Sequence, residues 1–330
     1  MNRARIHVLG LGGTIAMAGL GERGVVPSLT AEDLLQAVPQ LAQAADVTAS
    51  SLRMVAGSHL TIEDLLALAQ EAQRLLASGV DGIVVTQGTD TIEEIAFGLD
   101  LLVPGEAPLV VTGAMRNPRL PGADGPANLL GAVLVAASPQ ARGLGGLVVF
   151  NDEIHAARFV QKTHTQSPAT FRSRQAGPIG WLAEGRVRVA LRPPRRYCVQ
   201  VPADAPALQV GLVTLCLGDD GRLLRAAGEI GYAGLVLEAL GGGHALPPLV
   251  PILASLVERM PVVMASRTGC GEVLTKTYGF PGSESDLIAH GLIPAGMLDG
   301  PKSRLLLTLL MRAGVTREQV AGWFRIWLDG

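Results

Sequence analysis

Short runs of Val, Ile and Leu alternate along this chain with longer stretches in which apolar residues recur every three or four positions. The short runs include residues 4–10, 82–86, 108–114 and 146–152. Continuous apolar runs of this length are typical of strands that are covered on both faces. One longer stretch, 61–78, begins with Thr61 and Asp64, and another begins with Thr30 and Asp33, both in the spacing of a capping box. The alternation predicts βαβ units and a mostly parallel, doubly wound α/β sheet.

The apolar pattern is interrupted once. Residues 185–207 lose the helical period and contain adjacent prolines at 193–194. Strand-like and helical stretches then resume at 208–215, 233–241, 250–260, 261–268, 301–312 and 316–328. We therefore predict a larger N-terminal catalytic α/β domain over 1–190, a linker over 191–207, and a smaller C-terminal α/β domain over 208–330.

Composition and charge narrow the class of protein. The 330 residues are 48% hydrophobic and 4% aromatic, which is enough apolar material for a large aliphatic core. The formal net charge is −2, and the basic residues are scattered, so no stripe can neutralise phosphates and we expect no nucleic-acid partner. The basic cluster at 192–196 stands beside two prolines, which is typical of a solvated linker.

Several absences bear on location and cofactors. The chain has no apolar run of about 18 residues, the length that spans a bilayer, and its first residues do not read as a secretion signal. Cys198, Cys216 and Cys270 are odd in number and widely spaced, which argues against a disulfide framework or a zinc cluster. None of the six histidines has the spacing of an HExxH motif. We expect a soluble cytoplasmic protein that needs no metal and no cofactor.

Two glycine-containing turns offer candidate chemistry. TQGTDT at 86–91 follows an apolar run and opens a helical pattern, which places Thr89 and Asp90 at the carboxyl end of a buried strand. GGTIA at 12–16 ends the first strand and presents Thr14 in what we predict to be a second strand-to-helix turn. A threonine hydroxyl becomes a nucleophile when a base removes its proton and a nearby amide holds the oxyanion. The two turns together predict a threonine-based acyl-transfer site.

Each of these residues also has a structural interpretation. Thr14 could cap a helix, and Asp90, three residues before Glu93, could be an N-cap. Lys162 lies in a polar segment after the fourth apolar run; a lone lysine is usually solvated, but next to an aspartate and a threonine it can accept a proton. A dinucleotide site is disfavoured, because Ile15 stands where the third glycine of that fingerprint is expected.

Several segments together make a resemblance specific. They are GGTIA, AGSHLTIEDL, VVTQGTDTIEE, VVTGAMRNP, GADGPANL and KTYGF. With them the chain resembles the bacterial L-asparaginase family, the two-domain amidohydrolases that include the glutaminase-asparaginases, over almost its full length. The resemblance implies that Thr14 forms the acyl-enzyme and that Thr89, Asp90 and Lys162 form a second threonine triad. The implied reaction is a double displacement that converts L-asparagine to L-aspartate and ammonia and leaves room for a minor glutaminase activity.

The resemblance also implies how the substrate is held. Ser58 matches the residue that binds the α-carboxylate, helped by backbone groups of Gly57 and Gly88. Asp90 matches the residue that receives the α-amino group. Ala114 matches the position whose backbone carbonyl faces the leaving amide nitrogen.

This sequence departs from the family pattern at three places. The loop at 16–28 has no tyrosine where the family usually has one, so we hypothesise that Tyr278 or Glu284 of a neighbouring subunit serves Thr14; the alternative is that both belong to an ordinary surface loop. His59 stands where glutamine is common in members that accept glutamine, and it either narrows the pocket toward asparagine or is a bystander. His244 stands where the family tends to have an asparagine that contacts substrate across the subunit interface.

Two further functions stay open on the sequence. The missing tyrosine suggests a catalytically weak relative that binds asparagine or aspartate as a sensor. The glutaminase subunit of a tRNA-dependent amidotransferase also resembles this family. The family resemblance implies a homotetramer made of two intimate dimers, with a small-molecule substrate as the other partner.

Overall fold

The computed structural model describes residues 3–21, 24–27, 29–194 and 198–327. The chain divides into two compact units, Met1–Cys198 and Val199–Gly330. Residues 195–197 of the predicted linker lie outside the described residues, and 195 and 196 also belong to the basic cluster. The predicted domain bounds therefore stay a prediction.

A mixed sheet of eight strands forms the centre of the first unit, as far as its described residues show. Their order is β12-β11-β8-β7-β6-β5-β1-β4. The strands are β1 (Arg5–Gly12), β4 (Asp46–Val55), β5 (Gly82–Thr86), β6 (Leu109–Thr112), β7 (Gly146–Phe150), β8 (Glu153–Ala156), β11 (Gly180–Ala183) and β12 (Arg186–Val189). Neighbours from β4 to β7 run parallel, and β8, β11 and β12 continue the sheet antiparallel. The predicted α/β class and parallel strands are confirmed. The antiparallel edge was not predicted, because β11 and β12 are only four residues long and are largely exposed.

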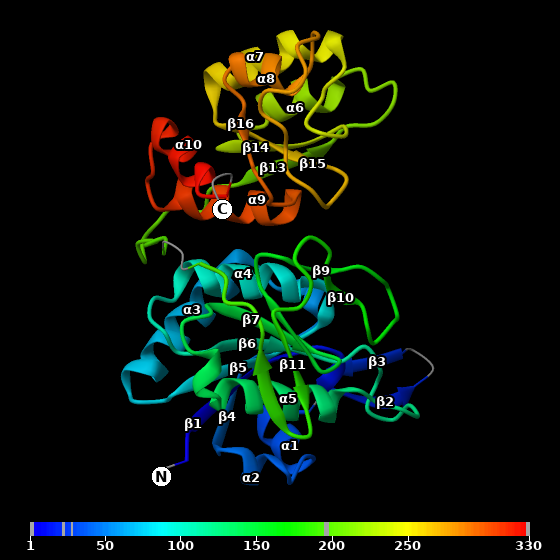
Figure 1. Ribbon diagram of the computed structural model, residues 1–330, viewed down its shortest axis with the longest axis vertical. Helices are drawn as coiled ribbons and strands as arrows, with labels where there is room; N and C mark the ends of the chain where they lie inside the picture. Colours follow the sequence, from blue (N-terminus) through cyan, green and yellow to red (C-terminus); the bar gives the residue numbers. More distant parts are fainter. Residues whose placement is uncertain (1–2, 22–23, 28, 195–197, 328–330) are drawn as a thin grey trace. The chain divides into compact units, whose positions relative to one another are not determined.

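Helices cover both faces of this sheet (Figure 1). They are α1 (Ala31–Gln36), α2 (Leu41–Ala44), α3 (Ile62–Ala77), α4 (Ile92–Leu102) and α5 (Gly125–Ala137). α3 and α4 lie on one face, and α1, α2 and α5 lie on the other. Both predicted capping boxes form, with Thr30 and Asp33 at α1 and Thr61 and Asp64 at α3. Double coverage explains why every residue of β5 is buried and why the run is continuously apolar.

The turn after β1 differs from the prediction. It is a single 3₁₀ turn, Thr14–Ala16, that leads into a hairpin of β2 (Met17–Gly21) and β3 (Gly24–Pro27), and the next helix begins only after Thr30. The predicted strand-to-helix turn at Thr14 is therefore wrong, and so is the interpretation of Thr14 as a helix cap. The physical reason is local: Gly12 and Gly13 both have positive φ, which ends the strand abruptly, and no helical apolar period follows.

A second hairpin consists of β9 (Val160–Lys162) and β10 (Phe171–Ser173) and forms its own two-stranded sheet. It packs against α4. Lys162 is the last residue of β9 on this hairpin.

The second unit is a smaller α/β layer structure, which confirms the predicted class. Over the residues that are described, its sheet is parallel with the order β13-β14-β15-β16. The strands are β13 (Val210–Thr214), β14 (Gly234–Ala239), β15 (Val262–Ser266) and β16 (Ile293–Pro294). The helices are α6 (Arg222–Glu229), α7 (Val250–Arg259), α8 (Glu284–Ala289), α9 (Gly300–Arg312) and α10 (Arg317–Arg325). α6, α7 and α8 share one apolar core with β14 and β15.

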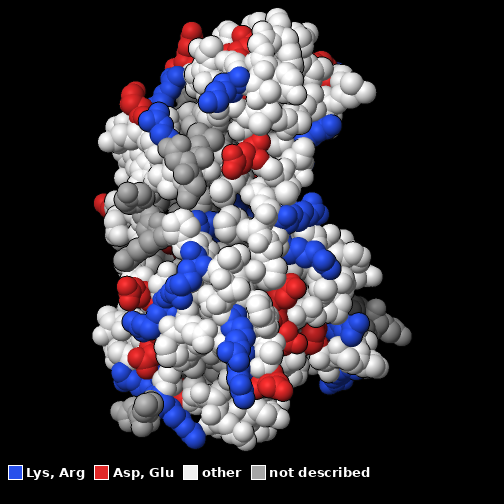
Figure 2. Space-filling view, in the orientation of Figure 1, with Lys and Arg blue, Asp and Glu red and all other residues white. Residues whose placement is uncertain are grey.

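The surface agrees with a low proportion of charged residues. On the face shown in Figure 2, acidic and basic side chains occur on both units, and most of the surface is uncharged. Among the described residues, no helix combines the length and the apolar character that crossing a membrane requires.

Candidate active site

Glycine backbones from neighbouring strand ends touch each other at the carboxyl edge of the large sheet. A Cβ placed on Gly13, after β1, would lie 2.0 Å from the backbone nitrogen of Gly88, after β5. A Cβ on Gly57, after β4, would lie 2.8 Å from Gly88 O, and one on Gly113, after β6, would lie 2.6 Å from Gln87 O. Real Cβ atoms need more than 3 Å, so these positions accept only glycine without movement of the backbone.

Each of these glycines directly precedes a predicted site residue. The following residues are Thr14, Ser58, Thr89 and Ala114. β4, β1, β5 and β6 are consecutive parallel neighbours in the sheet, so all four residues leave the sheet at the same edge. The structure therefore brings together segments that are up to 100 positions apart in sequence, at the edge where parallel α/β sheets bind ligands.

Lys162 completes a hydrogen-bonded group with two of these residues. Its Nζ donates to Thr89 Oγ1 at 2.8 Å and to Asp90 Oδ1 at 2.8 Å. Thr89 is 7% exposed, whereas the side chain of Asp90 is 58% exposed. A buried hydroxyl in contact with an amine is the arrangement that proton transfer requires, and the open carboxylate remains available to a cation.

Glu93 fixes the backbone at Lys162. Its carboxylate, on the first turn of α4, accepts the Lys162 backbone N–H. The N-cap of α4 is Thr91, and Asp90 lies in the preceding 3₁₀ turn, Thr89–Thr91. The alternative interpretation of Asp90 as the helix N-cap is therefore wrong. Asp90 and Glu93 both bond to Lys162, one through its side chain and the other through its backbone.

Two further residues of TQGTDT, Gln87 and Thr91, hold the turns of the site together through hydrogen bonds. Gln87 is fully buried, and its Nε2 donates to Gly88 O at 3.2 Å and to Thr91 Oγ1 at 3.3 Å. Thr91 Oγ1 donates in turn to Gly57 O at 3.1 Å. Sequence reasoning missed both residues; only Gln87, directly after the buried strand β5, carried a usable signal.

Asp124 and Asn128 hold the segment that contains Ala114. The Asp124 carboxylate accepts the backbone N–H groups of Met115 and Arg116, each at 2.9 Å. Asn128 Nδ2 donates to Gly113 O at 3.0 Å. These two residues come from GADGPANL, which the sequence analysis used only as part of the resemblance.

The site is open on its outer side. Ser58 and His59 are exposed in the 3₁₀ turn Gly57–His59, and Thr14 is half-buried. Gly57, Gly88 and Ala114, whose predicted roles use only backbone groups, are buried. A polar substrate can therefore contact the exposed side chains on one side and the backbone groups of the buried residues on the other.

The three predicted cross-subunit residues form one cluster in the second unit. The His244 ring packs edge-on against Tyr278, with centroids 5.1 Å apart, and its Nε2 lies 3.3 Å from Glu284 Oε2. Glu284 is fully buried and accepts the N–H groups of Thr277 and Tyr278. Burial opposes the charged carboxylate, but these N–H groups and His244 outweigh it and hold the pKa of Glu284 below its usual value.

The burial of Glu284 distinguishes it from Tyr278, the other residue predicted to activate Thr14. Glu284 anchors the loop at 277–278 within its own unit, so the interpretation of it as an ordinary surface residue is wrong. Tyr278 is 45% exposed and remains accessible. Their action on a neighbouring subunit stays a prediction.

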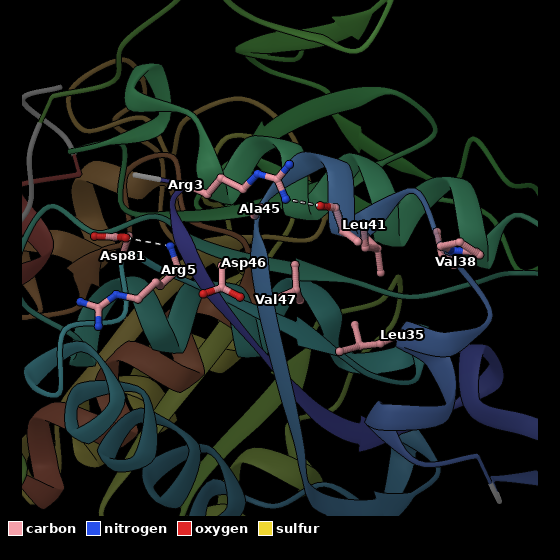
Figure 3. A pocket seen from close by; sticks show the side chains of 11 residues that line it. Arg3, Arg5, Leu35, Val38, Leu41, Ala45, Asp46, Val47 and Asp81 are labelled. Atoms are coloured by element: carbon pink, nitrogen blue, oxygen red, sulfur yellow. Dashed lines mark hydrogen bonds between the residues drawn. The ribbon is translucent and has the colours of Figure 1, made fainter. Parts of the chain in front are cut away.

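A cavity of about 1060 Å³ lies at the opposite edge of the large sheet (Figure 3). Arg3 and Arg5 at the start of β1, Asp46 at the start of β4, and Leu35 and Leu41 from the adjoining helices line it. Ligands of parallel α/β sheets bind beyond the carboxyl ends of the strands, and this cavity is at the amino ends. The glycine contacts therefore remain the candidate site.

Comparison with known proteins gives consistent matches. The family model described as asparaginase, N-terminal, matches residues 5–195, and the glutaminase/asparaginase C-terminal domain matches residues 209–324. The chain is 37% identical to a probable L-asparaginase of Deinococcus radiodurans, with 96% of this chain and 95% of that protein covered. It is 32% identical to L-asparaginase 2 of Escherichia coli, with 96% and 91% covered.

A solved structure shares the whole fold. It is a probable cytoplasmic L-asparaginase from Campylobacter jejuni, with a TM-score of 0.88 and 30% sequence identity, and the match covers 98% of this chain and 99% of that one.

Proposed function

The chain belongs to the asparaginase family, and we propose that it converts L-asparagine to L-aspartate and ammonia through an acyl-enzyme on Thr14. It is a hydrolase that acts on asparagine, as the full-length matches to L-asparaginases support. The observation that carries the proposed mechanism is the Lys162 amine, bonded to both Thr89 and Asp90 where the Thr14 segment meets Gly88.

The proposed reaction has two displacements. Thr14 Oγ1 attacks the side-chain amide carbon, and the C–N bond breaks to release ammonia and leave a β-aspartyl ester. Water then attacks the ester carbon, and the bond to Thr14 breaks to release aspartate. The second triad moves the protons: Thr89 Oγ1 accepts one from the attacking hydroxyl or water while its own passes along the 2.8 Å contact to Lys162 Nζ, which acts as the base. The reverse transfer protonates the leaving nitrogen in the first step and the Thr14 oxygen in the second.

The α-groups of the substrate fit the outer part of the site. Ser58 and the backbone of Gly57 and Gly88 bind the α-carboxylate, and the exposed Asp90 carboxylate receives the α-ammonium group. The Ala114 carbonyl faces the leaving nitrogen. Glutamine is one methylene longer, a difference worth about 1–3 kcal/mol in a binding pocket.

We also propose the assembly and location that the family implies. The active form is a homotetramer of two intimate dimers in the cytoplasm, in which Tyr278 or Glu284 of a neighbour serves Thr14 and His244 contacts the substrate. The exposure of Tyr278 and its ring contact with His244 support a joint role for that cluster.

Steady-state release of ammonia from L-asparagine, L-glutamine and D-asparagine tests the function. Thr14→Ala and Thr89→Val should each lower kcat on asparagine by at least about 100-fold. Thr48→Val, which removes an exposed hydroxyl on β4 away from the site, should keep the wild-type rate. Full activity in both site variants would refute the mechanism, and binding of asparagine without ammonia release by the wild type would favour the sensor.

A further inference from the structure

Thr91 links two segments that both contact the substrate in the proposed mechanism. The turn Gly57–His59 carries Ser58, the proposed α-carboxylate site, and the turn Thr89–Thr91 carries part of the acyl-transfer chemistry. Thr91 Oγ1 donates to Gly57 O at 3.1 Å and so ties one turn directly to the other. These residues are 34 positions apart in sequence.

Gln87 fixes the direction of that hydrogen bond. Its Nε2 donates to Thr91 Oγ1 at 3.3 Å, so one lone pair of the Thr91 hydroxyl accepts this hydrogen bond. The proton of the Thr91 hydroxyl therefore points to Gly57 O. Gln87 is fully buried and also donates to Gly88 O, within the same turn system. The relay therefore consists of one buried amide, one hydroxyl and two backbone carbonyls.

The backbones in this relay have no free space to slide. A Cβ on Gly57 would lie 2.8 Å from Gly88 O, and one on Gly88 would lie 2.5 Å from Gly57 N. Backbone contact limits approach of the two turns, and the Thr91 bond limits their separation. The distance between Ser58 and Thr89 is consequently constrained from both sides.

We propose that Thr91 is a specificity-determining positioning residue, which sets the distance between the α-carboxylate site at Ser58 and the reacting carbonyl near Thr89. A fixed distance accepts asparagine and disfavours glutamine, whose amide is one methylene farther from its α-carboxylate. The proposal rests on the proposed function and adds the group that determines substrate length. Thr91 acts through the backbone of Gly57 and needs no contact with the substrate.

A matched pair of variants tests this role. Thr91→Ser keeps the hydroxyl, whereas Thr91→Val keeps the shape and removes it. The readout is the ratio of kcat/KM for asparagine to kcat/KM for glutamine. We expect Thr91→Ser to stay within about twofold of the wild-type ratio and Thr91→Val to lower it by about tenfold, the discrimination that one methylene typically carries.

A second variant perturbs the hydrogen bond between Thr91 and Gly57 through Gln87, which orients the Thr91 hydroxyl. Gln87→Met fills a similar volume and removes the amide that orients Thr91, so it should lower the ratio in the same direction. It also carries the test if Thr91→Val does not fold, as judged by thermal melting. An equal loss on both substrates, with an unchanged ratio in Thr91→Val or Gln87→Met, would indicate general damage and would overturn the proposal.

The wild-type measurement separates this proposal from the function on which it rests. If the wild type released ammonia from neither substrate, the proposed function itself would fail. If it used both equally well, the function would stand, but nothing would select substrate length and the role of Thr91 would be refuted.

Discussion

Gly88→Ala tests whether the glycine contacts hold the candidate site together. Gly88 has φ −67° and ψ 140°, a conformation that any residue adopts, so the substitution adds no backbone strain. The added Cβ would lie 2.5 Å from Gly57 N and 2.8 Å from Gly57 Cα. Ordinary contact requires the turn that carries Ser58 to move away by about 1 Å.

Both stability and activity should respond to that movement. Overpacking of a buried site typically costs about 1–3 kcal/mol, which we expect to measure as a lower free energy of unfolding in urea. Displacing a substrate-positioning group by about 1 Å typically lowers the rate about 100-fold. We therefore expect kcat/KM for asparagine, measured by ammonia release, to fall by about that factor.

Gly322→Ala is the matched control. Gly322 lies in α10, and a Cβ there would meet nothing within 4 Å. Alanine in a helix interior is favoured over glycine by up to about 1 kcal/mol, so this variant should be slightly more stable and fully active. If Gly88→Ala behaved like Gly322→Ala in both assays, the close packing of Gly57 and Gly88 would not be what positions the site.

Two further predictions concern ionisable side chains of the first unit. Lys162→Met removes the amine bonded to Thr89 and Asp90 and should lower kcat on asparagine at least about 100-fold while the circular dichroism of the fold stays unchanged. Unchanged turnover would exclude Lys162 from proton transfer. Burial, with a smaller effect of Arg172, lowers the pKa of His155 to about 4. The unfolded chain binds this proton more tightly, so stability from neutral His155 is complete above about pH 6.5 and falls toward pH 4, by at most about 3 kcal/mol. Urea unfolding at pH 7 and pH 4.5 should show this loss in the wild type and a smaller one in His155→Gln, and equal losses would refute it.

Much of the fold follows from local patterns in the sequence. β1, β5 and β7 are predicted from apolar runs because both faces of the parallel sheet are covered. α1 and α3 are predicted because their capping boxes and helical periods agree. β11 and β12 carry exposed residues on short segments. Their membership in the sheet depends on pairing of β11 with β8 and of β12 with β11, which no local pattern encodes.

Some residues of the candidate site could likewise be predicted from the sequence, and others could not. Thr89, Asp90 and Lys162 could be predicted because a family resemblance marks them, and the structure places them within hydrogen-bonding distance. Thr91 and Asn128 could not, because their partners are backbone carbonyls of Gly57 and Gly113, which any sequence supplies.

What selects those carbonyls is the packing of glycine on glycine. At Gly13, Gly57, Gly88 and Gly113 the missing side chains let four strand ends approach until backbone meets backbone. Only at that separation can the short side chain of Thr91 reach the neighbouring turn. The residues after the glycines supply the chemistry, and the glycines determine the distances at which it operates; a larger residue at any of the four positions should therefore impair catalysis even with every proposed catalytic side chain intact.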